Sequence, residues 1–182
     1  MSKVNKSVII ISFVFIYLSL LLISQDPDMF FTITSGKEIM SGNFYFNSHT
    51  NLPINIQQWL YAVFMYNFHK FGDLGDFMFV AIQNIILWIV SYIFIYSKTK
   101  DRFKAIIGPI ILTLLSYTYM INIRPQIITM IFLVTELIIL EEYKRTKKSF
   151  LLIFLIPIGI LSANFHQAVY LYHLFIMIPY II

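Results

Sequence analysis

Long apolar runs separated by short charged or polar stretches dominate the sequence. Each run approaches the ~20 residues that a helix needs to cross the ~30 Å hydrocarbon layer of a bilayer. The runs cover residues 7–24, 77–97, 105–123, 125–141, 150–165 and 168–182. Because only helices and closed barrels satisfy the backbone within lipid, the pattern predicts an all-α, polytopic transmembrane bundle of about six spans. The chain 1–182 is expected to form a single transmembrane domain.

Composition supports the same class of protein. Hydrophobic residues make up 59% of the chain and charged residues only 12%, which is more apolar surface than a soluble domain of this size can bury. The sequence contains no cysteine, so disulfides and thiolate metal sites are excluded. No polar face interleaves basic and aromatic residues as a nucleic-acid platform does. We therefore expect an integral protein of the cell membrane that contacts membrane lipid and does not bind nucleic acid.

Basic residues indicate how the spans are oriented. They precede the first span and follow the second and fourth spans: Lys3, Lys6, Lys98, Lys100, Arg102, Lys104, Lys144, Arg145, Lys147 and Lys148. These are ten of the thirteen basic residues, and the positive-inside rule assigns them to one side of the membrane. The sequence thus predicts a cytoplasmic N-terminus, provided that residues 56–71 do not cross the bilayer.

Residues 25–72 form the predicted first outer loop, with two helices lying in the membrane interface. Asp26 is expected to cap the first helix, Pro27 to occupy its first position, and Gly42 to follow its end. Asn55 is expected to cap the second helix, which covers residues 56–71. The polar residues 43–53 between them, including His49, predict a connecting loop.

With this orientation, the unusual polar residues collect on the outer face. They are Asp26 and Asp28 after the first span, Arg124 and Gln126 between the third and fourth spans, and Asn164, His166 and Gln167 between the fifth and sixth. An arginine on the outer side, between two apolar spans, indicates an anion to bind. The alternative is an ion pair between Arg124 and Asp26 or Asp28.

The order of these motifs resembles the N-terminal half of GT-C-type polytopic membrane glycosyltransferases. The resemblance rests on the acid pair after the first span, then residues 29–32 (MFFT), 36–39 (GKEI), 58–60 (QWL), 124–126 (RPQ) and 164–167 (NFHQ), and covers nearly the whole chain. It implies sugar transfer from a polyprenyl-phosphate carrier to an acceptor on the extracytoplasmic face. It also implies that the chain is incomplete relative to the family and works with a missing C-terminal portion or a partner subunit.

The resemblance also assigns roles to residues. Asp26 and Asp28 would be the catalytic base or the ligands of a divalent metal ion, and Arg124 and His166 would hold the lipid phosphate. Gln126, Gln58 and His49 complete the expected substrate-binding set. This set has the right chemistry, because a carboxylate can take the proton of the acceptor hydroxyl while cationic donors stabilise the leaving phosphate.

A second class of function remains open from the residues alone. Glu136 lies near the middle of the fourth span, where an acid is costly, and is expected to hydrogen bond to Gln83 or Asn84 or to belong to a polar path. His69 and His173 lack metal-like spacing and are expected to be structural. A non-enzymatic membrane protein, such as a transporter part or an assembly subunit, would use the same polar residues as a structural network.

Overall fold

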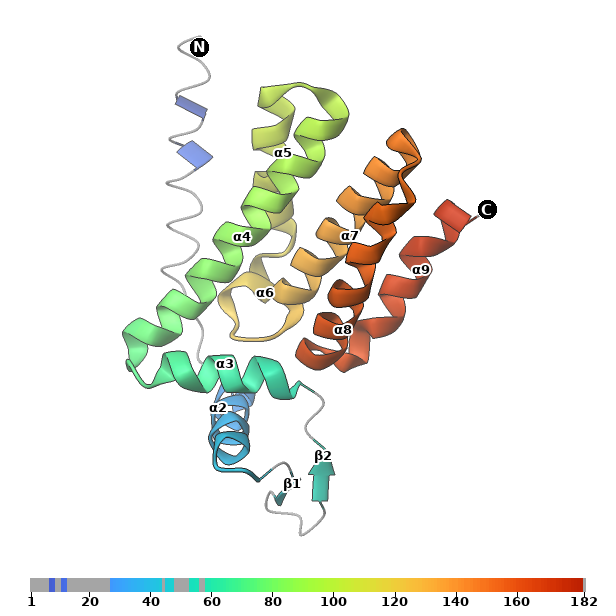
Figure 1. Cartoon of the computed structure of the whole chain (residues 1–182). Coiled ribbons are helices and arrows are strands. Elements are labelled where there is room, and N and C mark those ends of the chain that lie inside the picture. Colours follow the sequence, from blue (N-terminus) through green and yellow to red (C-terminus); the bar gives the residue numbers. More distant parts are fainter. Residues whose placement is uncertain are drawn as a thin grey trace.

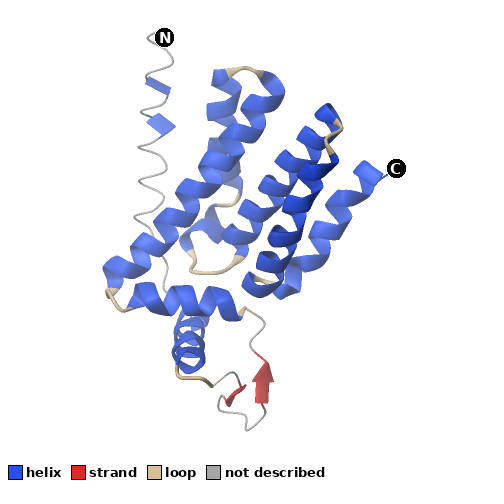
Figure 2. Ribbon diagram, in the orientation of Figure 1, coloured by secondary structure: helices blue, strands red, loops and turns tan. Residues whose placement is uncertain are grey.

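The computed structural model describes residues 7–8, 11–12, 27–43, 45–47, 53–55 and 58–181. Most of this part of the chain is helical (Figure 2), which confirms the predominantly helical prediction. Helices run back and forth between two ends of the molecule (Figure 1). They are α4 (Asp73–Thr99), α5 (Arg102–Leu115) with α6 (Tyr117–Ile121), α7 (Gln126–Thr146), η1 (Ser149–Phe154) with α8 (Leu155–Phe165), and η2 (Gln167–Val169) with α9 (Tyr170–Ile181). Most of the predicted first span, 7–24, lies outside the described residues.

One described helix, α4, is both long and apolar enough to cross a membrane. Its 27 residues extend over about 40 Å. Helix α7 has 21 residues but carries Glu136, Glu141 and Glu142, and α5 is separated from α6 at Ser116. Length and apolarity therefore support one spanning helix among the described residues, fewer than the six predicted.

Two shorter helices cross below the bundle at one end (Figure 1). They are α2 (Pro27–Met40) and α3 (Trp59–His69), and they confirm that two helices occupy the segment 25–72. The helices touch at Gly36, where an added Cβ would lie 2.1 Å from the carbonyl oxygen of Ala62. Gly42 follows the end of α2 with a φ of +91°, a conformation that glycine adopts readily. We call this end of the molecule the α3 end.

The segment between these helices differs from the prediction. Residues 43–53 were expected to form a plain loop, but β1 (Tyr45–Asn47) pairs with β2 (Pro53–Asn55) as an antiparallel hairpin in which Tyr45 faces Asn55. Asn55 is thus part of a strand and does not cap the second helix. That helix begins at Trp59, after Gln58, which makes no side-chain cap hydrogen bond. The predicted start at residue 56 and the predicted Asn55 cap were wrong, because Asn55 pairs with Tyr45 in the hairpin and the helix begins four residues later, at Trp59.

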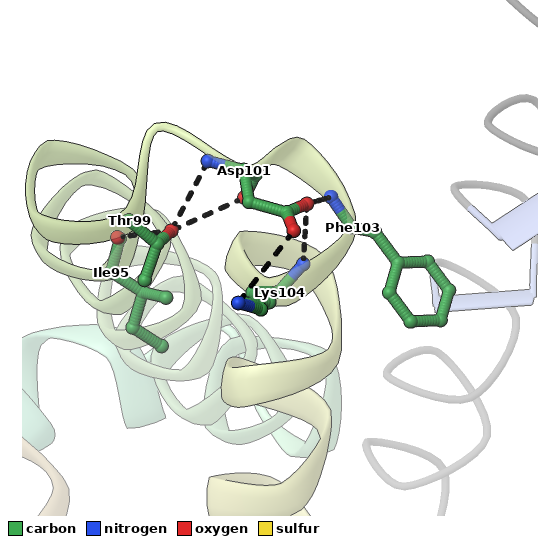
Figure 3. Close-up of polar contacts among 5 residues, drawn as sticks. All are labelled: Ile95, Thr99, Asp101, Phe103 and Lys104. Atoms are coloured by element: carbon green, nitrogen blue, oxygen red, sulfur yellow. Dashed lines mark hydrogen bonds and ion pairs between the residues drawn. The ribbon is translucent and has the colours of Figure 1, made fainter.

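The opposite end of the bundle gathers basic loops, and we call it the basic end. Helices α4 and α7 both end there at a lysine in the left-handed conformation, Lys100 (φ 54°) and Lys147 (φ 58°). Asp101 then begins α5, since its carboxylate accepts hydrogen bonds from the backbone N–H groups of Phe103 (2.8 Å) and Lys104 (3.3 Å) (Figure 3). Near this end, an ion pair between Lys98 and Glu141 joins α4 to α7. The basic loops after the second and fourth predicted spans therefore lie at the same end of the bundle.

In the bundle, many polar side chains are buried and many large apolar side chains are exposed. Buried polar residues include Gln83, Asn84, Ser91, Thr113, Ser116, Thr129, Glu136, Ser162 and His173. Large exposed apolar residues cover the outside: Met78, Ile82, Ile85, Ile86, Ile89, Ile93, Ile111, Leu114, Leu115, Phe150, Ile153, Ile156, Ile160, Leu171, Leu174 and Phe175. We call this set the apolar belt. Polar residues are mostly exposed in soluble proteins, so a bundle with this many buried polar side chains and exposed large apolar ones departs from the usual distribution.

Candidate functional site

Four segments distant in sequence meet at the α3 end and form a closed chain of polar contacts. They are the first turns of α2, the start of α3, the start of α7 and the end of α8. We call the participating residues the polar ring: Asp28, Thr32, Gln58, Trp59, Arg124, Thr129, Asn164 and His166. Four of the predicted site residues, Asp28, Gln58, Arg124 and His166, belong to it.

Asp28 and Arg124 form the ion pair of the polar ring. One guanidinium nitrogen of Arg124 lies 2.8 Å from a carboxylate oxygen of Asp28, and the side chains are 38% and 65% exposed, respectively. The alternative of pairing between these residues is therefore confirmed. Exposure matters for function, because both groups remain reachable from outside the protein. A guanidinium has five N–H donors in a planar fork, which suits a carboxylate or a phosphate.

Helices α2 and α3 are joined by a relay of hydrogen bonds next to this pair. The Thr32 hydroxyl donates to the carbonyl of Asp28 (2.8 Å) and accepts from the amide of Gln58 (3.4 Å). The following residue, Trp59, donates its indole N–H to Asn164 at the end of α8 (2.6 Å). Gln58 and Trp59 thus connect the α2 side of the ring to the α8 side.

His166 closes the ring on α7. Its Nδ1 lies 2.8 Å from the Thr129 hydroxyl, which donates its own proton to the carbonyl of Pro125 (3.1 Å). Whether Nδ1 donates to the hydroxyl or accepts from it depends on the tautomer of His166. Burial lowers the pKa of His166 below its usual value. His166 is consequently a neutral hydrogen-bonding group near neutral pH, and Arg124 is the cation of the site.

Gln126 provides an acceptor without a partner. It is the first residue of α7 and follows the ring residue Arg124 by two positions. Its side-chain oxygen is buried and makes no hydrogen bond to the described residues. An unsatisfied buried acceptor is costly, and a ligand hydroxyl or N–H is one way to satisfy it.

The predicted metal site and the predicted binding residue His49 involve residues that the structure does not describe. Asp26 and His49 lie outside the described residues. Within the described part, no group of three or more histidine, aspartate or glutamate residues is placed to hold a metal ion. Asp28 has a carboxylate oxygen at Arg124. Because the position of Asp26 is not described, a metal site at Asp26 and Asp28 stays a prediction.

A second polar group lies deeper on α7, and we call it the Glu136 line. Glu136 accepts at 2.6 Å from Nδ1 of His173 on α9, and Nε2 of His173 lies 2.6 Å from the hydroxyl of Ser162 on α8. All three side chains are buried. Glu136 thus makes an interhelical hydrogen bond as expected, but its partner is His173 on α9 and not Gln83 or Asn84 on α4. The signal in the sequence was an ionisable His173 within an apolar segment, which marks a buried polar contact.

The other histidine expected to be structural also has a carboxylate partner. His69, at the end of α3, lies 3.0 Å from both oxygens of the buried Asp76 on α4. This contact fixes the turn between the two helices and lies at the opposite end of α3 from Trp59.

Comparisons of the chain with protein families, with characterised proteins and with solved structures gave no match. The geometry above is thus the basis for assigning a function.

Proposed function

We propose that the chain is a polytopic membrane glycosyltransferase, or a portion of one. It would transfer a sugar from a polyprenyl-phosphate carrier to an acceptor on the extracytoplasmic face. One observation carries this proposal: the carboxylate of Asp28, the guanidinium of Arg124 and the imidazole of His166 come from three different segments and belong to one polar ring. Sugar transfer from a lipid phosphate needs an anion-binding cation beside groups that can accept a proton.

The apolar belt supports a location in the membrane. Large apolar side chains face outward on α4, α5, α8 and α9, while Gln83, Glu136 and His173 face inward. Bundles in lipid favour this arrangement, because polar groups are costly against hydrocarbon and are satisfied between helices. In this arrangement the basic end faces the cytoplasm, following the positive-inside rule, and the α3 end faces outward.

Each ring residue has a specific task in this reaction. Arg124 would bind the carrier phosphate with its planar fork, sharing its donors between the phosphate and Asp28. The carboxylate of Asp28, fixed by Arg124, would take the proton of the acceptor hydroxyl or, with Asp26, hold a divalent metal ion. The unpartnered oxygen of Gln126 would receive a hydrogen bond from a sugar hydroxyl, and the imidazole of His166 would hydrogen bond to another, because a hydroxyl can both donate and accept. His49 and Gln58 remain proposed binding residues.

Tryptophan fluorescence tests this proposal without knowledge of the sugar. The sequence has two tryptophans, and Trp59 belongs to the polar ring whereas Trp88 lies on α4. In the Trp88→Phe variant, Trp59 alone reports on the ring. We expect polyprenyl phosphate added to this variant in lipid nanodiscs to shift the Trp59 emission, and polyprenol of the same length to have no effect. Equal responses to the two lipids, or no response to the phosphate, would contradict the proposal.

The Glu136 line favours a second candidate, a non-enzymatic membrane protein such as a transporter part or an assembly subunit. A buried carboxylate and imidazole that connect α7 to α9 are typical of structural networks and of ion paths between helices. If this candidate is correct, Asp28→Asn will leave the activity of the intact protein unchanged, whereas the glycosyltransferase proposal requires that variant to lose sugar transfer.

A further inference from the structure

A cleft of about 290 Å³ lies between α7, α8 and α9, away from the polar ring. Glu136 lies seven residues, or about 10 Å of helix, beyond the ring residue Thr129. Glu136 and His173 line the cleft, together with apolar residues and Gly159. Two of the lining residues, Ile156 (62% exposed) and Ile160 (59% exposed), belong to the apolar belt. The cleft therefore opens at the surface that we assign to lipid.

The direction of the Glu136 line determines what the cleft can do. A serine, a histidine and an acid in hydrogen-bonded order resemble the groups that activate a nucleophilic serine. Of these three residues, Glu136 and His173 line the cleft and Ser162 does not. A ligand in the cleft therefore meets no serine nucleophile, and the acid that lines the cleft is Glu136, which is held by His173.

The carboxylate of Glu136 has one committed oxygen and one spare oxygen. Its Oε2 accepts from His173 at 2.6 Å, whereas its buried Oε1 makes no hydrogen bond to the described residues. Leaving a buried carboxylate oxygen unsatisfied is costly, more so than for a neutral acceptor. A hydrogen-bond donor placed in the cleft would remove this cost, and the apolar walls would accommodate an alkyl chain attached to the donor.

We propose that this cleft binds a membrane-dissolved amphiphile whose head group, a hydroxyl or an ammonium, donates a hydrogen bond to Oε1 of Glu136. The inference rests on the proposed location in the membrane and is independent of sugar transfer. A molecule that reaches the cleft laterally from the bilayer would bind with its head at Glu136 and its chain along Ile156 and Ile160.

Three photoreactive probes test this site on the full chain in lipid nanodiscs. Each is a dodecyl chain with a diazirine near its head, and the heads are ammonium, hydroxyl and methyl. We expect the two donor heads to label peptides from α8 and α9 at the cleft about tenfold more than the methyl head, the ratio expected for one hydrogen bond to a charged group. Equal labelling of the cleft by all three probes in the unmodified protein would overturn the proposal.

Variants distinguish the two head groups and test the role of Glu136. We expect Glu136→Gln to reduce labelling by the ammonium probe but to keep labelling by the hydroxyl probe, because the amide oxygen still accepts a hydrogen bond. Glu136→Leu should remove the preference for both donor heads, and a preference that persists in this variant would overturn the proposal. Gly159→Leu, which fills the cleft, should reduce labelling with Glu136 intact, whereas Gly159→Ala adds a methyl group that meets Tyr170 only at 3.8 Å and should not.

The methyl probe provides a separate check on membrane location. It should label the apolar belt on α5, at Ile111, Leu114 and Leu115, which are exposed and distant in sequence from the cleft. Failure to label these residues would count against embedding in the membrane. Labelling of the belt without a head-group preference at the cleft would count against the amphiphile site alone.

Discussion

The polar ring and the Glu136 line both use α7 to join an acid, a histidine and a hydroxyl, but they differ in exposure. Asp28 and Arg124 of the ring are 65% and 38% exposed in their side chains. Glu136 and His173 are 1% and 2% exposed. The two groups contact α7 at Thr129 and at Glu136, about 10 Å apart along the helix, yet residues of similar chemistry have different environments in them.

This difference determines how much each group contributes to stability. Exposed ion pairs contribute little to stability, because water solvates both partners in their absence. Removing one partner of a buried polar contact lowers the stability more, because the remaining partner stays desolvated. We therefore expect changes in the ring to affect phosphate binding with little effect on folding, and changes in the Glu136 line to affect folding as well as the amphiphile binding proposed above.

The largest effect on stability is expected from breaking the Glu136 line. His173→Leu leaves the buried carboxyl of Glu136 without its donor and should lower the free energy of unfolding by about 2–4 kcal/mol. The double variant Glu136→Leu with His173→Leu should recover much of this loss, because neither buried polar group remains. Unfolding in detergent measures both values. A single variant as stable as the unmodified protein would contradict this assignment.

A smaller loss is expected at the crossing of α2 and α3. In Gly36→Ala the added Cβ would meet the Ala62 carbonyl oxygen at 2.1 Å, so the two helices must separate. We expect a loss of about 1–3 kcal/mol and a change in Trp59 emission, because α3 carries Trp59 to its bond with Asn164. Gly159→Ala is the matched control, since its Cβ has only ordinary contacts. Equal stability of the two alanine variants would refute the close packing at Gly36.

The ion pair of the ring should contribute still less to stability. A double-mutant cycle with Asp28→Asn and Arg124→Gln is expected to give a coupling energy below about 1 kcal/mol, the range measured for exposed pairs. The measurement is again the free energy of unfolding in detergent. A coupling as large as the loss in His173→Leu would mean that the ring is a structural element like the Glu136 line.

The smallest effect is a pH dependence at His166. Burial lowers the pKa of folded His166 below its unfolded value, so the unfolded state binds the proton first as the pH falls. This residue therefore contributes no pH dependence well above the unfolded pKa, and stability decreases as the pH falls from that pKa toward the folded one. The His166→Gln variant should have a flatter profile over the same interval. Parallel profiles for the two proteins would contradict the burial of His166.

The sequence predicted the helical segments and the residues of the ring better than their contacts. Pro27 and Gly42 marked the limits of α2 because their backbone preferences act locally. The sequence placed Asp28 and Arg124 at the same end of the bundle. It left open whether Arg124 binds an external anion or pairs with Asp26 or Asp28. Thr129 was missed because a threonine within an apolar helix carries no distinctive signal until α8 brings His166 beside it.

Long-range packing explains the remaining differences. Glu136 could reach several helices, and sequence distance does not indicate that α9 rather than α4 supplies its partner, His173. The hairpin containing Asn55 was missed because its short strands lie in a polar segment that resembles a loop. In both cases the deciding contact joins residues whose local patterns favour another arrangement.

The central claim, that Arg124 of the polar ring binds a lipid phosphate, is tested most directly by the affinity for polyprenyl phosphate in nanodiscs. Arg124→Gln and Lys148→Gln remove the same charge, one from the ring and one from an exposed position at the basic end. We expect Arg124→Gln to weaken binding by about tenfold or more, as for the loss of a charged hydrogen-bonding pair, and Lys148→Gln to leave the Kd unchanged. Equal Kd values for the two variants would contradict the account.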